Sequence, residues 1–315
     1  MIILPTPSDL PSQIPDLPAT YYADIPYRNK VDITFDMFVP TGGRSTKPWV
    51  LFLHGGGYIS GSSSGIYNGI ENETQLRALI AADITVISMN YSLIVEDGTE
   101  TVGVSKAHND VSVGIRYIKF NSTVLGIEKD NMGFYGRSAG AGALIVFCGR
   151  DWAEPDRTGT MWAESTRPVV VAAYRPQPYD VPGWYDYFPT LTFAAIFDGT
   201  QDELLERLYP FYGLQYPTLP DVPAAEDFYT TAIVNEREKL NTVANANPVG
   251  IPMHLENFSA NVPPEPNNVD QLIHNPAYSQ AFKEQWELFG EEVNYYTVDP
   301  PAESTAEFII SKLNV

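Results

Sequence analysis

A serine between two glycines offers the clearest chemistry in the sequence. Residues 131–137, NMGFYGR, form a short run with several apolar positions that leads to Ser138, and a second apolar run follows at once. A G-x-S-x-G pattern between a strand and a helix is typical of a nucleophile elbow. Gly136 and Gly140 lie where a Cβ atom would collide with neighbouring backbone. We therefore expect Ser138 to be a nucleophile at a helix N-terminus, which favours developing negative charge. The alternative is an ordinary serine in a glycine-rich turn.

A glycine loop about 80 residues upstream complements this serine. Residues 49–53, WVLFL, are expected to form a buried strand, and the sequence HGGG follows at 54–57. Acyl transfer requires backbone N–H groups aimed at the oxyanion, and glycines let the backbone approach the substrate closely. An HGGG loop is the usual partner of the elbow in lipases and esterases. We expect Gly56, Gly57 and Ala139 to form an oxyanion hole.

These two motifs, in this order, resemble those of the α/β-hydrolase family, specifically the small HGGG carboxylesterases. Residues 90–93, NYSL, are similar to a Y-R-L segment of the family with Ser92 in place of arginine. Asp110 occupies the place of a helix aspartate found in relatives. The segments STRP at 165–168 and QPYD at 177–180 resemble a bacterial esterase-like subgroup. The resemblance implies a serine–histidine–acid triad.

The elements around the motifs alternate between strands and helices. Buried strands are expected at 85–89, 167–174, 248–255 and 293–298, and helices at 71–82, 104–120, 276–288 and after a capping box at 304–307. Such alternation predicts right-handed βαβ units and a mostly parallel sheet flanked by helices. The fold class is therefore α/β, an α/β-hydrolase fold in a single domain that spans residues 1–315. Residues 1–20 contain five prolines and are expected to form an extended arm.

Aromatic residues are dense between 174 and 230, and a capping box at 200–203 is expected to open a helix there. A long aromatic insertion at about 175–235 fits a cap or lid over an apolar acyl or aryl pocket. Ordinary packing of a helical excursion is the alternative. We expect Tyr58, Trp184 and Tyr187 to contact the substrate.

The catalytic base is harder to place, because the chain has only four histidines. In this fold the histidine usually follows the last strand, yet residues 299–304 contain none. His54, His108 and His254 lie in contexts that suit structural roles. His274 lies in the segment IHNP, which resembles an I-H-H-P element of the bacterial subgroup. The following helix N-terminus would disfavour its imidazolium form, so we expect His274 to be the base. The alternative is a loop histidine that only caps the helix.

The triad acid stays open. Relatives place an aspartate in the turn after the strand at 248–255, where this chain has Ser259. The leading candidates are Asp180 and Asp270, and the remaining ones are Glu256, Asp299 and Glu303.

The amino-acid composition limits the classes of molecule that the protein is expected to bind. The 315-residue chain has 39 acidic and 19 basic residues and a net charge of −20, which argues against binding to nucleic acids and anionic membranes. Its single cysteine, Cys148, excludes an internal disulfide. No ligand cluster or phosphate loop predicts a metal or a cofactor. We expect a small-molecule ester as the partner, and a homodimer is compatible with the sequence. The N-terminus predicts a cytoplasmic location, unless a leader has been removed.

The leading function is a serine carboxylic-ester hydrolase that cleaves short-chain acyl or aryl esters through an acyl-enzyme on Ser138. The alternative keeps the fold with a degenerate triad, as a lyase, a cyclase or a non-catalytic binding protein. It rests on the missing histidine after the last strand and the missing aspartate before it.

Overall fold

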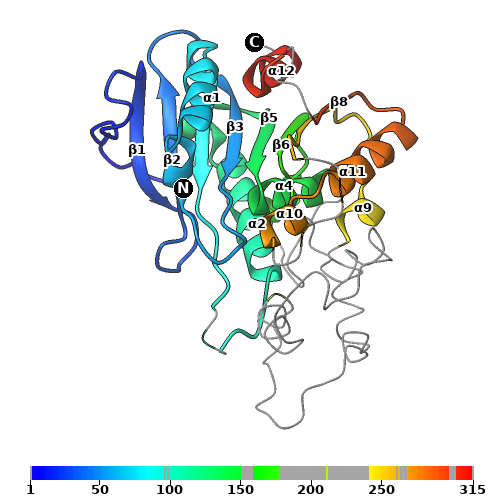
Figure 1. Ribbon diagram of the computed structural model, residues 1–315. Helices are drawn as coiled ribbons and strands as arrows, with labels where there is room; N and C mark the ends of the chain where they lie inside the picture. The colour runs from blue at the N-terminus through cyan, green and yellow to red at the C-terminus, as the bar shows by residue number, and fades with distance from the viewer. Residues whose placement is uncertain are drawn as a thin grey trace.

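The described part of the chain centres on one twisted sheet (Figure 1). The computed structural model describes residues 2–95, 97, 99–149, 159–177, 211, 241–259, 262, 265, 268–297 and 303–313. Within these ranges eight strands follow the order β1-β2-β4-β3-β5-β6-β7-β8. Their bounds are β1 Ala19–Pro26, β2 Thr34–Pro40, β3 Lys47–Leu53, β4 Thr85–Met89, β5 Ile127–Arg137, β6 Val170–Tyr174, β7 Met253–Glu256 and β8 Val293–Tyr296. The pairs β1–β2 and β2–β4 are antiparallel, and the other neighbours are parallel.

Helices cover both faces of this sheet. In the part of the chain that the structure describes, the α-helices are α1 Ile70–Ala81, α2 Ser105–Phe120, α3 Ser122–Leu125, α4 Ala139–Gly149, α9 Thr242–Asn245, α10 Val269–Ile273, α11 Pro276–Leu288 and α12 Thr305–Lys312. Short 3₁₀ helices span Ser63–Ile66 and Thr160–Ala163. In Figure 1, α1 and α12 lie together on one side of the sheet, and α2, α4 and α11 lie on the other.

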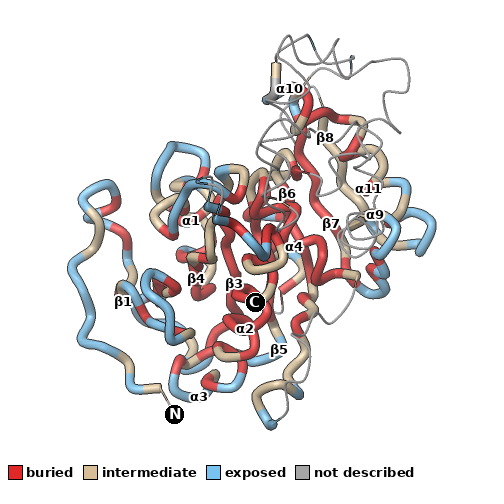
Figure 2. Tube along the Cα trace, turned by 90° about the horizontal axis from the view of Figure 1, so that it is seen from below, coloured by how far each residue is buried: buried red, intermediate tan, exposed pale blue. Residues whose placement is uncertain are grey.

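The pleat of β3 explains how one apolar run serves both faces. Trp49, Leu51 and Leu53 belong to the core cluster that α2, α4 and α11 cover. Val50 and Phe52 belong to the second cluster, beneath α1 and α12. Successive side chains of a strand point to opposite faces, so a strand buried on both sides must be apolar throughout. Figure 2 shows this burial along β3, β4 and β5, whereas much of the N-terminal segment is exposed.

Strand register brings the ends of four elements to one edge of the sheet. Leu53 of β3 pairs with Gly136 of β5, and Tyr174 of β6 pairs with both Arg137 and Glu256. The glycine loop, the elbow and the segments after β6 and β7 therefore all begin at the carboxyl ends of parallel strands. Ligands of open α/β sheets bind at this edge.

The predicted fold class is confirmed, and so are two helix starts. Asn275 caps α11 by accepting the Ala277 N–H, and Ser304 forms a capping box with Glu307 at α12. Two elements were not predicted. Residues 19–26 form the antiparallel edge strand β1, which begins at the end of the expected arm at 1–20, and residues 269–273 form α10.

Other predictions stay open. The cap at 175–235 and the capping box at 200–203 lie almost entirely outside the described residues, and the single-domain division stays a prediction. Among the described helices, none combines the length and the apolar character needed to span a bilayer.

Candidate active site

Ser138 occupies a tight turn between β5 and α4. Its φ angle is +50°, a conformation that a residue with a side chain rarely adopts. A Cβ atom on Gly136 would lie 2.7 Å from the Ala141 backbone, and one on Gly140 would lie 2.3 Å from the Leu53 carbonyl oxygen. Both glycines are therefore required by the close approach of the chain, as the sequence predicts. Backbone strain of this kind persists where the surrounding structure enforces it, often at functional sites.

Hydrogen bonds on both sides of Ser138 hold the turn in place. The Ser138 N–H donates to the Tyr174 carbonyl at 2.9 Å. The Ser138 carbonyl accepts the N–H groups of Gly142 at 3.0 Å and Gln177 at 3.1 Å. Because its backbone is fixed from α4 and from the segment after β6, the Ser138 side chain has a defined direction.

The structure brings Ser138, His274 and Asp270 together in one hydrogen-bonded chain. His274 Nε2 lies 2.7 Å from Ser138 Oγ, and His274 Nδ1 lies 2.8 Å from Asp270 Oδ1. A carboxylate only accepts hydrogen bonds, so Nδ1 carries the proton and Nε2 is free to accept the hydroxyl proton of Ser138. This is the geometry of a nucleophile, a general base and an orienting acid.

Local sequence explains why one short helix carries both the base and the acid. Asn268 caps α10 by accepting the Gln271 N–H, and His274 is the C-terminal cap of the same helix. Residues four apart lie on one face of a helix, so Asp270 and His274 are neighbours. The His274 N–H also donates to the Asp270 carbonyl at 3.0 Å.

Asn257, directly after β7, ties this helix to the sheet. Its side-chain NH₂ donates to the His274 carbonyl and to Ser279 Oγ, each at 3.0 Å. Asn257 is fully buried, so these bonds form away from water. They connect the base, the first turns of α11 and the end of β7.

Electrostatics favour the reactive protonation states of the pair. Burial lowers the pKa of His274 below its ordinary value, and the nearby charge of Arg175 lowers it further, while Asp270 opposes the shift. Burial alone would raise the pKa of Asp270, but the Arg175 hydrogen bond and the charges of His274 and Arg175 outweigh it and lower that pKa. Near neutral pH the base is therefore neutral and the acid ionised.

The glycine loop lies against the nucleophile. A Cβ atom on Gly55 would lie 3.1 Å from Ser138 Cβ. Gly56 and Gly57 have φ angles of +112° and +63°, and the Gly56 carbonyl accepts the N–H groups of Ile59 and Ser60 at 3.0 Å. Within the described residues, the Gly56 and Gly57 N–H groups have no acceptor. They are available to an oxyanion beside Ser138.

Comparisons with known proteins agree with this geometry. Residues 35–154, which include the glycine loop and Ser138, match the BD-FAE family model. Para-nitrobenzyl esterase of Bacillus subtilis (strain 168) is 23% identical over 151 residues, which cover 46% of this chain and 28% of that protein. The chain thus matches little more than a quarter of that relative's length.

Solved structures of esterases share the architecture. An inhibited esterase B from Lactobacillus rhamnosis superposes with a TM-score of 0.56 at 17% identity, over 89% of this chain and 76% of that one. Esterase 2 of Thermogutta terrifontis, phosphoramylated by tabun, gives a TM-score of 0.55 at 14% identity, over 94% and 93%. This chain has the α/β-hydrolase fold. The esterase relatives and the assembled residues support a serine hydrolase of the carboxylesterase type.

Tyr58 has a different place in the structure from the one expected. The sequence predicts a substrate contact, but the side chain is fully buried and its hydroxyl donates to the Ala139 carbonyl. Its bulk fills the space behind the elbow, so we assign it a supporting role. Asp180, Trp184 and Tyr187 lie outside the described residues.

The other three histidines have structural surroundings, as expected. His54 stacks on Tyr91 with ring centroids 4.3 Å apart, and burial lowers its pKa to about 4. His108 is buried in α2, edge-on to Tyr58 and Phe147. His254 Nε2 lies 2.7 Å from Glu256 Oε1 in the core.

The remaining acid candidates are engaged elsewhere or lie outside the description. Glu256 also accepts the Thr305 hydroxyl at 2.6 Å, which joins β7 to α12. Glu303 accepts a hydrogen bond from Asn294 at 3.3 Å. Asp299 lies outside the described residues, and Ser259 donates its N–H to the Asn257 side chain. Of the described candidates, Asp270 alone reaches His274 Nδ1.

Two residues that contact the Ser138–His274–Asp270 group were missed from sequence: Asn257 and Arg175. The Arg175 guanidinium lies 2.7 Å from Asp270 Oδ2. Their position in the sequence could have indicated them, because both residues are polar and directly follow a parallel strand at the ligand-binding edge of the sheet.

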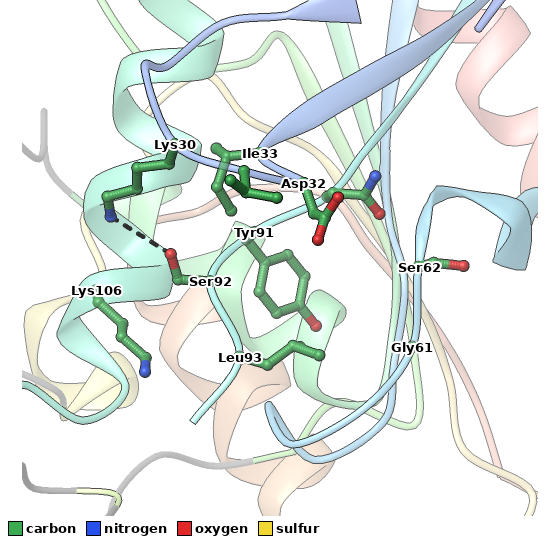
Figure 3. Close-up of a pocket in the computed structure, with 11 residues that line it drawn as sticks. Lys30, Asp32, Ile33, Gly61, Ser62, Tyr91, Ser92, Leu93 and Lys106 are labelled. Carbon is green, nitrogen blue, oxygen red and sulfur yellow. Dashed lines mark hydrogen bonds between the residues drawn. The ribbon is translucent and has the colours of Figure 1, made fainter. Parts of the chain in front are cut away.

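A groove of about 660 Å³ is lined by Tyr91 together with other polar and apolar side chains (Figure 3). The Tyr91 ring also stacks on His54 of the glycine loop. Lys30 and Lys106 line the groove, but Lys30 pairs with Asp110 at 3.2 Å and Lys106 pairs with Glu100. Because its cationic groups are already neutralised by neighbouring carboxylates, we assign the groove no catalytic role.

Proposed function

We propose that this protein is a serine carboxylic-ester hydrolase that acts through an acyl-enzyme on Ser138. The observation that carries the proposal is the continuous chain from Ser138 Oγ through His274 to Asp270, with contacts of 2.7 and 2.8 Å. The esterase relatives add support, since one of the similar solved esterases is phosphoramylated by tabun.

The acylation step follows from the geometry. Ser138 Oγ attacks the ester carbonyl carbon while His274 Nε2 takes the hydroxyl proton. Asp270 stabilises the imidazolium that forms. The oxyanion of the tetrahedral intermediate receives hydrogen bonds from the N–H groups of Gly56, Gly57 and Ala139. Collapse breaks the carbon–oxygen bond of the ester, and His274 returns its proton to the leaving alcohol.

Deacylation repeats the cycle with water. His274 Nε2 removes a proton from a water molecule, which attacks the acyl carbon. The second tetrahedral intermediate uses the same N–H groups, and its collapse releases the carboxylic acid and returns the proton to Ser138. No cofactor is needed for either step.

The proposed substrates are small esters with short acyl or aryl groups. The similarity to a para-nitrobenzyl esterase supports this class, as does the aromatic content of residues 174–230. The absence of a histidine in residues 299–304 is the feature that favours a lyase, a cyclase or a binding protein. The 2.7 Å contact between His274 Nε2 and Ser138 Oγ favours hydrolysis over these alternatives.

The test is hydrolysis of p-nitrophenyl acetate and butyrate by the wild-type protein and by Ser138→Ala. We expect activity in the wild type and its loss in the variant, with an unchanged circular dichroism spectrum. An inactive wild type, or a variant that turns over at a comparable rate, would overturn the proposal.

A further inference from the structure

Asp270, the acid of the Ser138–His274–Asp270 group, is exposed, so burial does not fix the orientation of its carboxylate. The Asp270 side chain is 62% exposed and belongs to a helix of only five residues. In the well-known serine protease triad the aspartate is buried, and its surroundings fix its direction. Burial cannot do so for Asp270, so another contact has to limit rotation of its carboxylate.

Arg175 supplies that contact from the end of β6. One guanidinium nitrogen lies 2.7 Å from Asp270 Oδ2, while Oδ1 faces His274 Nδ1 at 2.8 Å. Each carboxylate oxygen thus has its own partner, which fixes the plane of the group. Arginine suits this task because its planar guanidinium presents donors in a rigid arrangement.

The backbone of Arg175 is itself firmly placed. Its φ angle is +47°, and its N–H donates to the Glu256 carbonyl at 2.7 Å. The residue before it, Tyr174, accepts the Ser138 N–H, and Gln177 donates to the Ser138 carbonyl. One short segment therefore holds the backbone of the nucleophile and the side chain of the acid.

We propose that Arg175 is a positioning residue of the catalytic triad, which clamps the Asp270 carboxylate in register with His274 and Ser138. The inference rests on the proposed function, because it assigns how the acid of that site is held. Arg175 has no contact with the reacting atoms in this role. Its effect passes through Asp270 to the orientation of the imidazole.

Charge gives the clamp a measurable signature. The described charged groups that act on His274 are Asp270 on its own helix and Arg175 at the end of β6, and Ser138 faces it from the elbow. Arg175 lowers the pKa of His274, so its removal must raise that pKa. The base works only when neutral, so activity would then begin to fall at a higher pH as the solution is acidified.

The test compares Arg175→Met with Arg175→Lys and with a matched control. Arg77→Met also removes one partly exposed arginine from two ion pairs, one with Glu73 on the same helix α1 and one with Asp16 of the N-terminal segment. For Arg175→Met we expect kcat on p-nitrophenyl butyrate to fall 10- to 100-fold, the usual effect of a misplaced catalytic group, with a smaller change in KM. The acid limb of kcat/KM should move to higher pH. Arg175→Lys should keep the acid limb near the wild-type position, and Arg77→Met should match the wild type.

A second readout does not depend on turnover. The imidazole of His274 is titrated by NMR in Ser138→Ala with and without Arg175→Met, and the second protein should titrate at higher pH. If Arg175→Met does not fold, Arg175→Gln replaces it in both measurements, with the same upward shift expected.

If the wild type is active and Arg175→Met has the same kcat and the same acid limb, the proposed clamp is wrong. An unchanged titration of His274 on loss of Arg175 would also contradict it. An inactive wild type would instead contradict the proposed function, and the NMR titration would still decide whether Arg175 acts on His274.

Discussion

Replacing Asp270 with asparagine should damage catalysis more than replacing it with alanine. The reason lies in the two contacts of the carboxylate. Arg175 only donates hydrogen bonds, so the asparagine oxygen must face Arg175 and its NH₂ group must face His274. Nδ1 would then accept a hydrogen bond, and the imidazole proton would move to Nε2. An Nε2–H group cannot take the proton of Ser138.

The two substitutions differ in expected magnitude. For Asp270→Asn the wrong tautomer should lower kcat by about 10⁴-fold, or about 5.5 kcal/mol, as in a triad whose acid becomes an amide. Asp270→Ala removes the ion pair with the imidazolium but leaves the tautomer free. Such a pair is worth about 1 kcal/mol in water and about 4 kcal/mol near a protein surface. The 62% exposure of Asp270 places it between these values, so we expect a loss of about 10- to 10³-fold.

The assay is kcat for p-nitrophenyl butyrate at pH 7.5 in the wild type, both variants and the double variant Asp270→Asn/Arg175→Met. The double variant lets the amide turn its oxygen toward His274, so it should recover part of the activity that Asp270→Asn loses. The predicted tautomer change is wrong if Asp270→Asn is at least as active as Asp270→Ala, or if loss of Arg175 lowers the activity of Asp270→Asn further.

Three further predictions follow from other contacts. Because burial and Arg175 lower the pKa of His274, the acid limb of kcat/KM should lie below the ordinary histidine pKa of about 6.5. A wild-type acid limb above that value would contradict the buried position of His274 beside Arg175. In Gly56→Ala a Cβ atom would lie 2.2 Å from the Ser60 carbonyl oxygen, so the glycine loop must shift. We expect kcat to fall about 10²- to 10³-fold, with a smaller change in KM. An unchanged kcat would show that this loop does not form the oxyanion hole. Arg28→Met should destabilise the protein by about 3 kcal/mol in urea unfolding, because Arg28 lies 2.7 Å from the fully buried Asp110; a loss under about 1 kcal/mol would show that Lys30 suffices.

Features encoded by neighbouring residues could be predicted from sequence. The elbow depends on glycines two positions either side of Ser138, and the caps of α11 and α12 depend on Asn275 and Ser304. The central strands can be recognised as apolar runs because both faces of the sheet are covered. These determinants lie within a few residues of the feature that they specify.

Features that depend on distant segments could not be predicted in this way. The Arg28 guanidinium reaches Asp110 across 82 positions, beside Ser92 where the family pattern has an arginine. Arg175 and Asp270 are separated by 95 positions. Asp270 therefore stayed one of two leading candidates for the acid.

Tyr58 and β1 show that a local sequence pattern can also predict the wrong structure or miss an element. An aromatic residue after a glycine loop predicts a substrate contact, but the tight turn directs Tyr58 into the core beneath Ala139. The edge strand β1 begins at the end of the expected arm at 1–20, and it forms by pairing with the distant strand β2. In both cases tertiary packing decided the outcome.

The central claim is that His274 activates Ser138 as a nucleophile, and covalent labelling tests it most directly. The wild type, Ser138→Ala and His274→Asn are treated with a fluorophosphonate, and the adducts are measured by intact-protein mass spectrometry and peptide mapping. The account predicts one adduct on Ser138 in the wild type, none in Ser138→Ala, and labelling of His274→Asn at a rate at least 100-fold lower. No adduct on the wild type, an adduct at another residue, or equal labelling rates with and without His274 would contradict it.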